Sequence, residues 1–217
     1  MADFAQARRT MVDGQVRIAD VTDPRILAAM GDIGRERFVP AAKAPLAYLD
    51  LDVPVREGPA RYLLKPMVLA KMIQAADVRP DDRILDVGCA TGYSSALLAH
   101  LGHAVVALEE DRDLAAAATR ALADVANVSV VTGMLRAGWP AGAPYDVIMV
   151  NGATEIAPEA LLSQLRDGGR LVCVRGGGPA GKAALHRMDG GDVSTRPIFD
   201  AAAPLLPGFA RPVEFVF

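Results

Sequence analysis

The 217-residue sequence has no long apolar run. A helix needs about 20 mostly apolar residues to span a bilayer, and charged residues interrupt the alanine-, valine- and leucine-rich stretches before that length, so we expect no membrane association. The first residues, MADFAQARRTMVDGQVR, carry charges throughout and lack the apolar core of a signal peptide. We therefore expect a cytoplasmic protein.

Residues that form disulfides, metal sites and nucleic-acid surfaces are also scarce. Cys89 and Cys173 lie far apart and form no CxxC pair, so we expect buried, reduced thiols. His100, His103 and His186 have no ligand spacing, and no metal site is expected. The formal net charge is −3, and the 23 lysines and arginines form no stripe along the chain. A nucleic-acid partner is therefore not expected.

Helical patterns dominate the first third of the chain. Thr22 or Asp23 can cap a helix whose first residue is Pro24, a favoured residue at that position. A loop follows, in which Gly58 and Pro59 are among the residues that interrupt regular secondary structure and the stretch AYLDLDVPV is briefly extended. The predicted elements are helices over 3–18, 23–34 and 66–78, with the loop over 41–65.

From residue 80 onward strands alternate with helices, which is typical of a doubly wound α/β domain with a mostly parallel sheet. The late strands follow one another without a helix, which predicts an antiparallel edge. We expect a single domain over 1–217, made of a helical extension (1–79) and an α/β core (80–217). The predicted strands are 82–90, 103–109, 128–133, 145–153, 170–177, 182–193 and 211–217, and the predicted helices are 92–102, 111–125 and 157–169.

The stretch DVGCATGY lies at the first turn from strand to helix, where such folds bind ligands. It does not match a dinucleotide fingerprint, because Ala90 and Tyr93 stand where the second and third glycines would be, and it lacks the GK[ST] of a phosphate loop. What remains is D-x-G-x-x-x-G, followed by Glu109 at the end of the next strand. Glu109 can accept hydrogen bonds from two ribose hydroxyls and Asp86 can hold an ammonium group. S-adenosylmethionine fits this pattern, and a turn without a ligand is the alternative.

Several short motifs, in order and over nearly the whole chain, resemble the protein-L-isoaspartate O-methyltransferases. The resemblance implies a Rossmann-like S-adenosylmethionine-dependent methyltransferase fold. In that family, methyl esterification of isoaspartyl carboxylates repairs damaged proteins, and S-adenosylhomocysteine is the product. A protein or peptide carboxylate would thus be the partner, and nothing indicates the oligomeric state. The motifs are MVDGQVR, DPRILAAM, RERFVP, AYLDLDVP, RILDVGCATGYSSALLA, VVALEED, NVSVVTGMLRAGWP, APYDVIMVNGA and LLSQLRDGGRLV.

The resemblance also implies which residues face the cofactor. Asn151 has two interpretations, since it can face the methyl end of the cofactor or cap a turn. The full set of expected cofactor-binding residues is Asp86, Gly88, Cys89, Ala90, Gly92, Tyr93, Glu109, Glu110, Gly133, Met134, Leu135 and Asn151.

Two departures from the family pattern concern the cofactor. Ala90 replaces a turn glycine, which is tolerable if its φ is negative. Met134 and Leu135 replace an Asp-Gly pair whose carboxylate would meet the adenine amino group. Losing a charged hydrogen bond costs about 1.5–3 kcal/mol, so we expect cofactor affinity to fall about tenfold to a hundredfold. Backbone N–H groups and stacking by Met134 or Leu135 can recover part of this loss.

A third departure concerns the methyl acceptor. The family carries a G-Q-T-I-S-Q-P loop here, and this chain reads ARYLLKP, with Tyr62 and Leu64 in place of the hydroxyl residues. An acceptor carboxylate is ionised at neutral pH and needs orientation and a dry site rather than a base. Arg61, Tyr62 and Lys65 can orient an anion. Alternatively, Leu63 and Leu64 pack under the sheet edge while Arg61 and Lys65 face water.

Three functions follow from these patterns. The first is an isoaspartyl methyltransferase, whose candidate acceptor-side residues are Arg61, Tyr62, Leu64 and Lys65. The second is a methyltransferase with another acceptor. The third is a non-catalytic cofactor-binding or interaction protein, because both the adenine carboxylate and the hydroxyl loop are altered.

Overall fold

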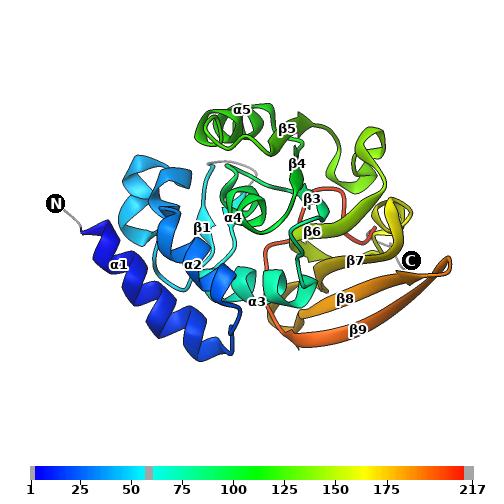
Figure 1. Ribbon diagram of the computed structural model, residues 1–217, viewed down its shortest axis with the longest axis horizontal. Helices are drawn as coiled ribbons and strands as arrows, with labels where there is room; N and C mark the ends of the chain where they lie inside the picture. Colours follow the sequence, from blue (N-terminus) through cyan, green and yellow to red (C-terminus); the bar gives the residue numbers. More distant parts are fainter. Residues whose placement is uncertain (1–2, 57–60, 213–217) are drawn as a thin grey trace, which may run out of the picture.

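The computed structural model describes residues 3–56 and 61–212. The predicted breakers Gly58 and Pro59 and most of the predicted strand over 211–217 lie outside these ranges. A seven-stranded sheet forms the centre of the molecule, in the order β5-β4-β3-β6-β7-β8-β9 (Figure 1). Its strands are β3 (Arg83–Val87), β4 (Ala104–Glu109), β5 (Val128–Thr132), β6 (Tyr145–Thr154), β7 (Leu165–Arg175), β8 (Lys182–Asp189) and β9 (Asp192–Asp200).

The sheet has the predicted doubly wound topology. Strands β3 to β7 pair in parallel, and β8 and β9 add antiparallel pairs at one edge. The chain runs outward from β3 through β4 to β5 and then resumes on the other side of β3 with β6. The direction therefore reverses between β3 and β6, and at such a switch point the strand ends leave a crevice for a ligand.

Alternating side chains of the strands build two apolar layers. Ile84 points into the larger core, under the helices, whereas Leu85 and Val87 point into the smaller core on the opposite face. The larger core is covered by α3 (Pro66–Ala76), α4 (Tyr93–Leu101) and α5 (Arg112–Ala121). The smaller core is covered by the short helix α6 (Glu159–Leu162), by 3₁₀ turns and by the segment around Phe209.

The N-terminal extension packs on the outside of the helical layer (Figure 1). Helix α1 (Phe4–Met11) continues into a π-helical turn over Val12–Val16 and a 3₁₀ turn over Arg17–Ala19, and α2 (Pro24–Asp32) follows. Asp23 caps α2 as predicted, because its Oδ1 accepts a hydrogen bond from the Arg25 N–H at 2.8 Å. The predicted loop contains 3₁₀ turns at Arg35–Phe38 and Ala41–Leu46 and a two-stranded pair, β1 (Val53–Pro54) with β2 (Tyr62–Leu63).

In the second half one predicted helix was wrong and one strand was missed. The helix expected over 157–169 covers only Glu159–Leu162. The Tyr145 N–H donates to the Gln164 carbonyl at 2.9 Å and Leu165 pairs with Tyr145, so the chain joins the sheet before it reaches the paired glycines. The strand β9 was not predicted over its length, because it is an exposed edge strand with Pro197 inside it.

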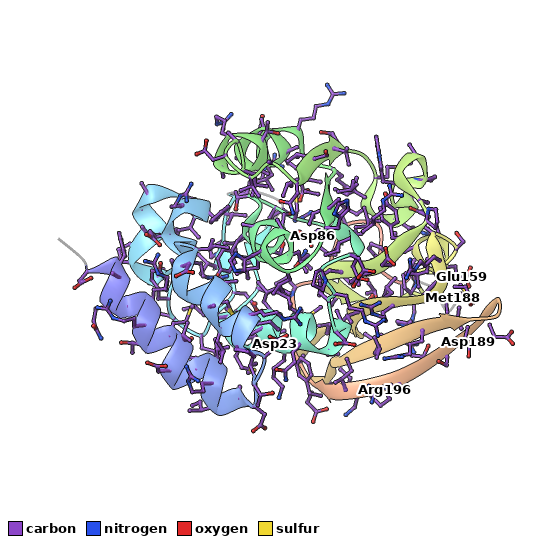
Figure 2. All side chains as sticks on the ribbon, viewed as in Figure 1. Asp23, Asp86, Glu159, Met188, Asp189 and Arg196 are labelled. Carbon is purple, nitrogen blue, oxygen red and sulfur yellow. The ribbon has the colours of Figure 1, made fainter. Side chains whose placement is uncertain are left out.

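Ionisable side chains separate into buried and exposed groups. Figure 2 shows Asp86 in the centre of the molecule, whereas Asp189 and Arg196 lie at the projecting β8–β9 edge.

Cys89 and Cys173 are free thiols and both are buried, as expected. Over residues 3–56 and 61–212, no helix is long and apolar enough to cross a membrane. Within the same ranges, histidine, cysteine, aspartate and glutamate form no group of three that could hold a metal ion.

Candidate functional site

The turn after β3 winds through three residues with positive φ. Gly88, Ala90 and Gly92 have φ values of 74°, 52° and 98°. Ala90 therefore does not meet the condition of a negative φ under which alanine would be tolerated without strain, and a non-glycine residue in this region costs about 1–2 kcal/mol. Its conformation directs the Ala90 N–H at the carboxylate of Glu109, 2.9 Å away. At Gly92 an added Cβ would lie 2.7 Å from Leu122 Cδ1, so glycine is required for space as well.

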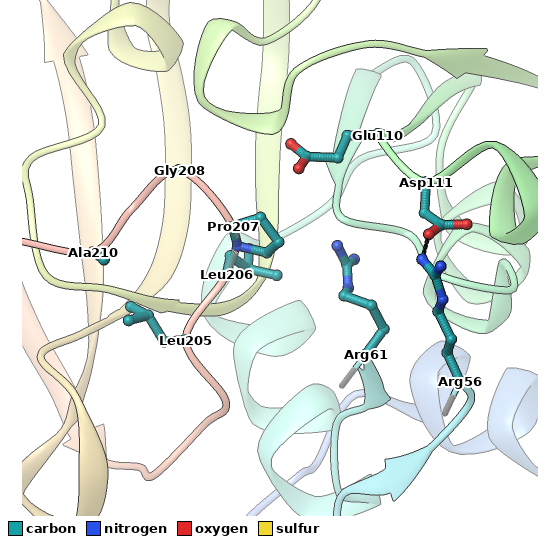
Figure 3. Close-up of a pocket in the computed structure, with 9 residues that line it drawn as sticks. All are labelled: Arg56, Arg61, Glu110, Asp111, Leu205, Leu206, Pro207, Gly208 and Ala210. Carbon is teal, nitrogen blue, oxygen red and sulfur yellow. Dashed lines mark ion pairs between the residues drawn. The ribbon is translucent and has the colours of Figure 1, made fainter. Parts of the chain in front are cut away.

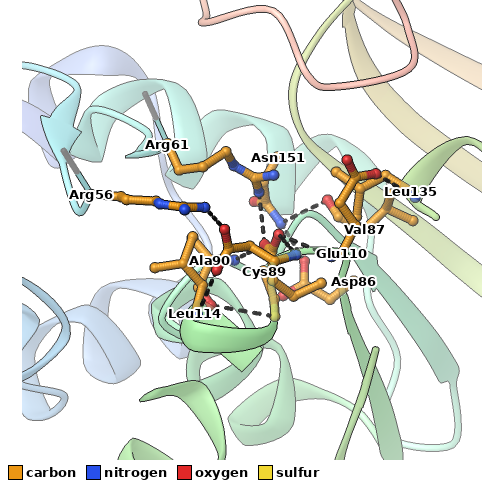
Figure 4. Close-up of polar contacts among 12 residues, drawn as sticks. Arg56, Arg61, Asp86, Val87, Cys89, Ala90, Glu110, Leu114, Leu135 and Asn151 are labelled. Carbon is orange, nitrogen blue, oxygen red and sulfur yellow. Dashed lines mark hydrogen bonds and ion pairs between the residues drawn. The ribbon is translucent and has the colours of Figure 1, made fainter. Parts of the chain in front are cut away.

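Asp86 lies at the end of β3, completely buried. Its Oδ2 accepts hydrogen bonds from the hydroxyls of Ser94 and Ser95 at 2.7 and 2.6 Å. Its Oδ1 accepts one from Asn151 Nδ2 at 2.5 Å (Figure 4). Burial raises the pKa of Asp86, although these three donors act in the opposite direction. Asn151 thus contacts the expected ammonium-binding carboxylate across the switch point between β3 and β6.

Glu109, at the end of β4, is also completely buried and accepts four hydrogen bonds. Its Oε1 accepts from the N–H groups of Glu110 and Asp111 at 3.0 and 3.1 Å. Its Oε2 accepts from the Ala90 N–H and, at 2.7 Å, from Nη2 of Arg61. Burial raises the pKa of Glu109, and the charge of Arg61 and the backbone donors oppose this shift. Of the four donors only Arg61 is a side chain.

The ARYLLKP loop was expected either to orient an anion through its polar side chains or to pack its leucines while Arg61 and Lys65 face water. The structure matches the second interpretation for the leucines but not for Arg61. Leu63 and Leu64 are buried, as the packing interpretation expected, but Arg61 is only 5% exposed and does not face water. Tyr62 and Lys65 are partly buried. Nη2 of Arg61 lies 3.2 Å from the position that a Cβ on Gly88 would take. The guanidinium group therefore covers the glycine turn.

A cavity of about 500 Å³ opens beside this ion pair. Figure 3 shows Arg56 and Arg61 extending toward the end of β4 from one side, with Leu205 to Pro207 on the other. Arg56 forms an ion pair with Asp111, the residue that caps α5. The cavity is lined by Arg56, Arg61, Glu110, Asp111, Leu205, Leu206, Pro207, Gly208 and Ala210.

On the other side of Arg61 the site is nearly filled. The cavity next to Gly88, Tyr93 and Asn151 measures only about 10 Å³, which is room for about one water molecule. Leu206 packs against the glycine turn, since its Cδ2 lies 3.2 Å from the position that a Cβ on Gly88 would take. The Leu206 N–H donates to the Ala153 carbonyl at 3.0 Å, which ties the segment to β6.

A second buried arginine, Arg35, holds the ARYLLKP loop through its backbone. Arg35 Nε donates to the Ala47 carbonyl at 2.8 Å and Nη2 donates to the Leu64 carbonyl at 2.7 Å. Its guanidinium lies 4.9 Å from the ring centre of Tyr93, whose pKa burial raises to about 12. Among the residues that the structure describes, Arg35 Nη1 and the Tyr93 hydroxyl have no hydrogen-bond partner. Arg35 and Leu206 were missed by sequence reasoning, since no spacing relates them to the glycine turn.

The residues expected on the adenine side lie at the end of β5. The Gly133 N–H donates to the Glu109 carbonyl at 3.1 Å, and the Leu135 N–H donates to Glu110 Oε2 at 3.3 Å. Leu135 is fully buried in the smaller core, whereas Met134 is 72% exposed. Of the two residues expected to stack on a base, only Met134 has its side chain at the surface. Cys89 is buried within the turn, and burial raises the pKa of its thiol.

The chain is similar to known proteins over most of its length. The family profile described as protein-L-isoaspartate(D-aspartate) O-methyltransferase matches residues 7–192. A protein-L-isoaspartate O-methyltransferase of Methylorubrum populi is 41% identical over 187 residues, which are 86% of each chain. One from Synechococcus sp. is 37% identical over 215 residues, covering 98% of this chain and 85% of the relative.

Solved structures agree on the fold. A protein-L-isoaspartate O-methyltransferase superposes with a TM-score of 0.80 at 23% identity, covering 93% of this chain and 66% of the other. A Plasmodium falciparum β-aspartate methyltransferase in complex with S-adenosyl-L-homocysteine gives a TM-score of 0.77 at 16% identity, covering 95% and 99%. The sheet order, the glycine turn and the sequence match together show that this chain belongs to the protein-L-isoaspartate(D-aspartate) O-methyltransferase family.

Proposed function

We propose that the chain binds S-adenosylmethionine and transfers its methyl group to the carboxylate of an isoaspartyl residue in a damaged protein. One observation supports this most directly. Glu109, a buried carboxylate at the end of β4, is framed by three backbone N–H groups next to a cavity of about 500 Å³. This is where the S-adenosylmethionine-binding pattern of the sequence requires a ribose acceptor.

The residues present fit the adenosine half of the cofactor. The cavity lies directly beyond Glu109 and is lined by Glu110, and the exposed Met134 follows the end of β5, the strand that pairs with β4. The methionine half would take Asp86 as the partner of its ammonium group. A space of about 10 Å³ cannot hold that half, so Arg61 and Leu206 must shift when the cofactor binds.

The methyl transfer requires no general acid or base from the protein. When bound, the sulfonium supplies an electrophilic methyl group. An acceptor carboxylate oxygen forms the new bond to the methyl carbon, the carbon–sulfur bond breaks, and its electron pair stays on sulfur, so no proton moves. The chain has to align the two groups and exclude water. The buried Leu63 and Leu64 and the closely packed Leu206 keep this region dry.

We extend the proposal to organisation and setting. Residues 1–217 would act as one domain, with 1–79 forming the acceptor side and 80–217 the cofactor side, in the cytoplasm. The partner would be a protein or peptide that carries the damaged carboxylate, and no nucleic acid or membrane is required.

A second candidate is a methyltransferase with a different acceptor. It is favoured by the loop itself, where a partly buried Tyr62 and a buried Leu64 replace two hydroxyl residues of the family pattern. Tyr62 and Leu64 differ from small hydroxyls in size and in hydrogen-bonding capacity. Such a change alters acceptor recognition more than it alters the chemistry of transfer.

Two measurements separate the functions. Calorimetry with S-adenosylhomocysteine tests the cofactor, and no heat of binding at millimolar ligand would leave only a non-catalytic role. A labelled-methyl assay then compares an isoaspartyl peptide with the same peptide carrying normal aspartate. Methylation of the isoaspartyl peptide alone supports the first candidate. Cofactor binding without methylation of either peptide excludes the first candidate.

A further inference from the structure

Arg61 presents two different faces to the site. Its Nη2 donates to Glu109 at 2.7 Å. Its Nη1 is buried and, within residues 3–56 and 61–212, has no hydrogen-bond partner. The side chain is only 6% exposed, covers Gly88 and lines the 500 Å³ cavity. A buried guanidinium with an unused donor, placed over the cofactor turn, is suited to an anionic ligand.

In this structure the Glu109 carboxylate cannot accept hydrogen bonds from a ribose while it also accepts one from Arg61. A carboxylate has about four acceptor positions, and all four are occupied by Arg61, Ala90, Glu110 and Asp111. The three backbone donors are held by the turn and by the start of α5. Arg61 is the donor that can leave, because it reaches Glu109 on a flexible side chain.

We propose that Arg61 exchanges partners during the reaction cycle. It pairs with Glu109 until the ribose hydroxyls take that carboxylate, and it then binds the carboxylate of the methyl acceptor over the glycine turn. An uncompensated buried charge is costly, so the displaced guanidinium requires a new anion. Because the loop offers Tyr62 and Leu64 instead of two hydroxyls, Arg61 replaces those hydroxyls as the acceptor-binding group. This inference rests on the proposed function and makes acceptor binding follow cofactor binding.

The substitutions Arg61→Met and Arg61→Lys test the exchange. Calorimetry measures the Kd of S-adenosylhomocysteine and of 5′-methylthioadenosine, which has the ribose but no carboxylate. Kinetics measure kcat and KM for an isoaspartyl peptide. Arg17→Met, which removes a charge from an exposed ion pair with Asp13, is the control for net charge.

We expect Arg61→Met to tighten both adenosine ligands about threefold to thirtyfold, because Glu109 loses a competing charged donor. The peptide KM should rise at least about tenfold with a much smaller change in kcat, and Arg61→Lys should restore part of the loss because it keeps the charge. Weaker binding of S-adenosylhomocysteine with unchanged binding of 5′-methylthioadenosine would overturn the proposal, because Arg61 would then hold the carboxylate of the cofactor.

An unchanged peptide KM in Arg61→Met would also overturn it. Thermal melting checks that the variants are folded, and Arg61→Lys carries the test if Arg61→Met is not. Failure of the unmodified protein to bind S-adenosylhomocysteine or to methylate the peptide refutes the proposed function, and the exchange with it. Normal methylation with unaltered variant constants refutes the exchange alone.

Discussion

Replacing Glu109 by alanine should separate the structural and the ligand-binding roles of this carboxylate. Three backbone N–H groups, those of Ala90, Glu110 and Asp111, lose their acceptor. A buried donor without a partner costs about 1–3 kcal/mol, and the low end applies because water can enter from the adjoining cavity. The guanidinium of the buried Arg61 also loses its partner, so the expected loss is at least about 3 kcal/mol, which lowers the Tm of a chain of this size by at least about 6 °C.

The same substitution should weaken cofactor binding. Two ribose hydroxyls donating to a carboxylate contribute about 1.5–3 kcal/mol each. Displacing Arg61 from Glu109 offsets about one such bond, so the net loss is about 1.5–3 kcal/mol, or about tenfold to 150-fold in Kd. Calorimetry with S-adenosylhomocysteine, run below the lowered Tm, measures the change.

The control is Glu159→Ala, which removes an exposed carboxylate at the start of α6 and should change neither quantity. Glu109→Gln is a second test variant. Its side-chain carbonyl can still accept hydrogen bonds from the Glu110 and Asp111 N–H groups, so it should unfold at a higher temperature than the alanine variant. A folded Glu109→Ala protein that binds S-adenosylhomocysteine within threefold of the unmodified chain would show that the ribose does not bind at the end of β4.

Three further outcomes are expected. Tyr62→Thr combined with Leu64→Ser should raise kcat/KM for an isoaspartyl peptide about tenfold if the loop controls the acceptor, and an unchanged value would argue against that control. Arg170→Met should lower the free energy of unfolding by about 3–5 kcal/mol in urea titration, because it leaves the buried Asp82, 2.5 Å away, without its charged partner; a loss below about 1 kcal/mol would contradict this. Burial lowers the pKa of His186 from 6.5 to about 4, so its stabilising neutral form is fully present above pH 6.5 and is lost as the pH falls toward 4, by at most about 1.4 kcal/mol per pH unit. His186→Gln should flatten the stability profile in that window, and an identical slope would count against the assignment.

Much of the fold could be predicted from local patterns. Asp23 followed by Pro24 marks the start of α2, and the alternation of strands and helices after residue 80 predicts the parallel sheet. Both signals depend on neighbouring residues, either through capping or through the hydrophobic period. The prediction failed at 157–169, where pairing of Leu165 with Tyr145 outweighed a helical pattern.

The candidate site was predictable only in part. Asp86 and Glu109 follow from their positions at the ends of adjacent strands, and the structure places both carboxylates in the buried end of the crevice. The positive φ of Ala90 was not predictable, because alanine rarely adopts that conformation without tertiary contacts to hold it. The burial of Arg61 was missed as well, since arginine before two leucines ordinarily faces water.

The amino-acid sequence by itself determined the family, the order of strands and helices, and the two carboxylates at the glycine turn. These depend on periodicity and on short-range motifs, which are complete within a few residues. Only the tertiary structure decided that Arg61 reaches Glu109 and that Leu206 lies over Gly88. Both contacts join segments that are far apart in the chain. They form only because the β1–β2 segment and the C-terminal segment pack across the ends of the sheet. No local sequence pattern specifies that packing.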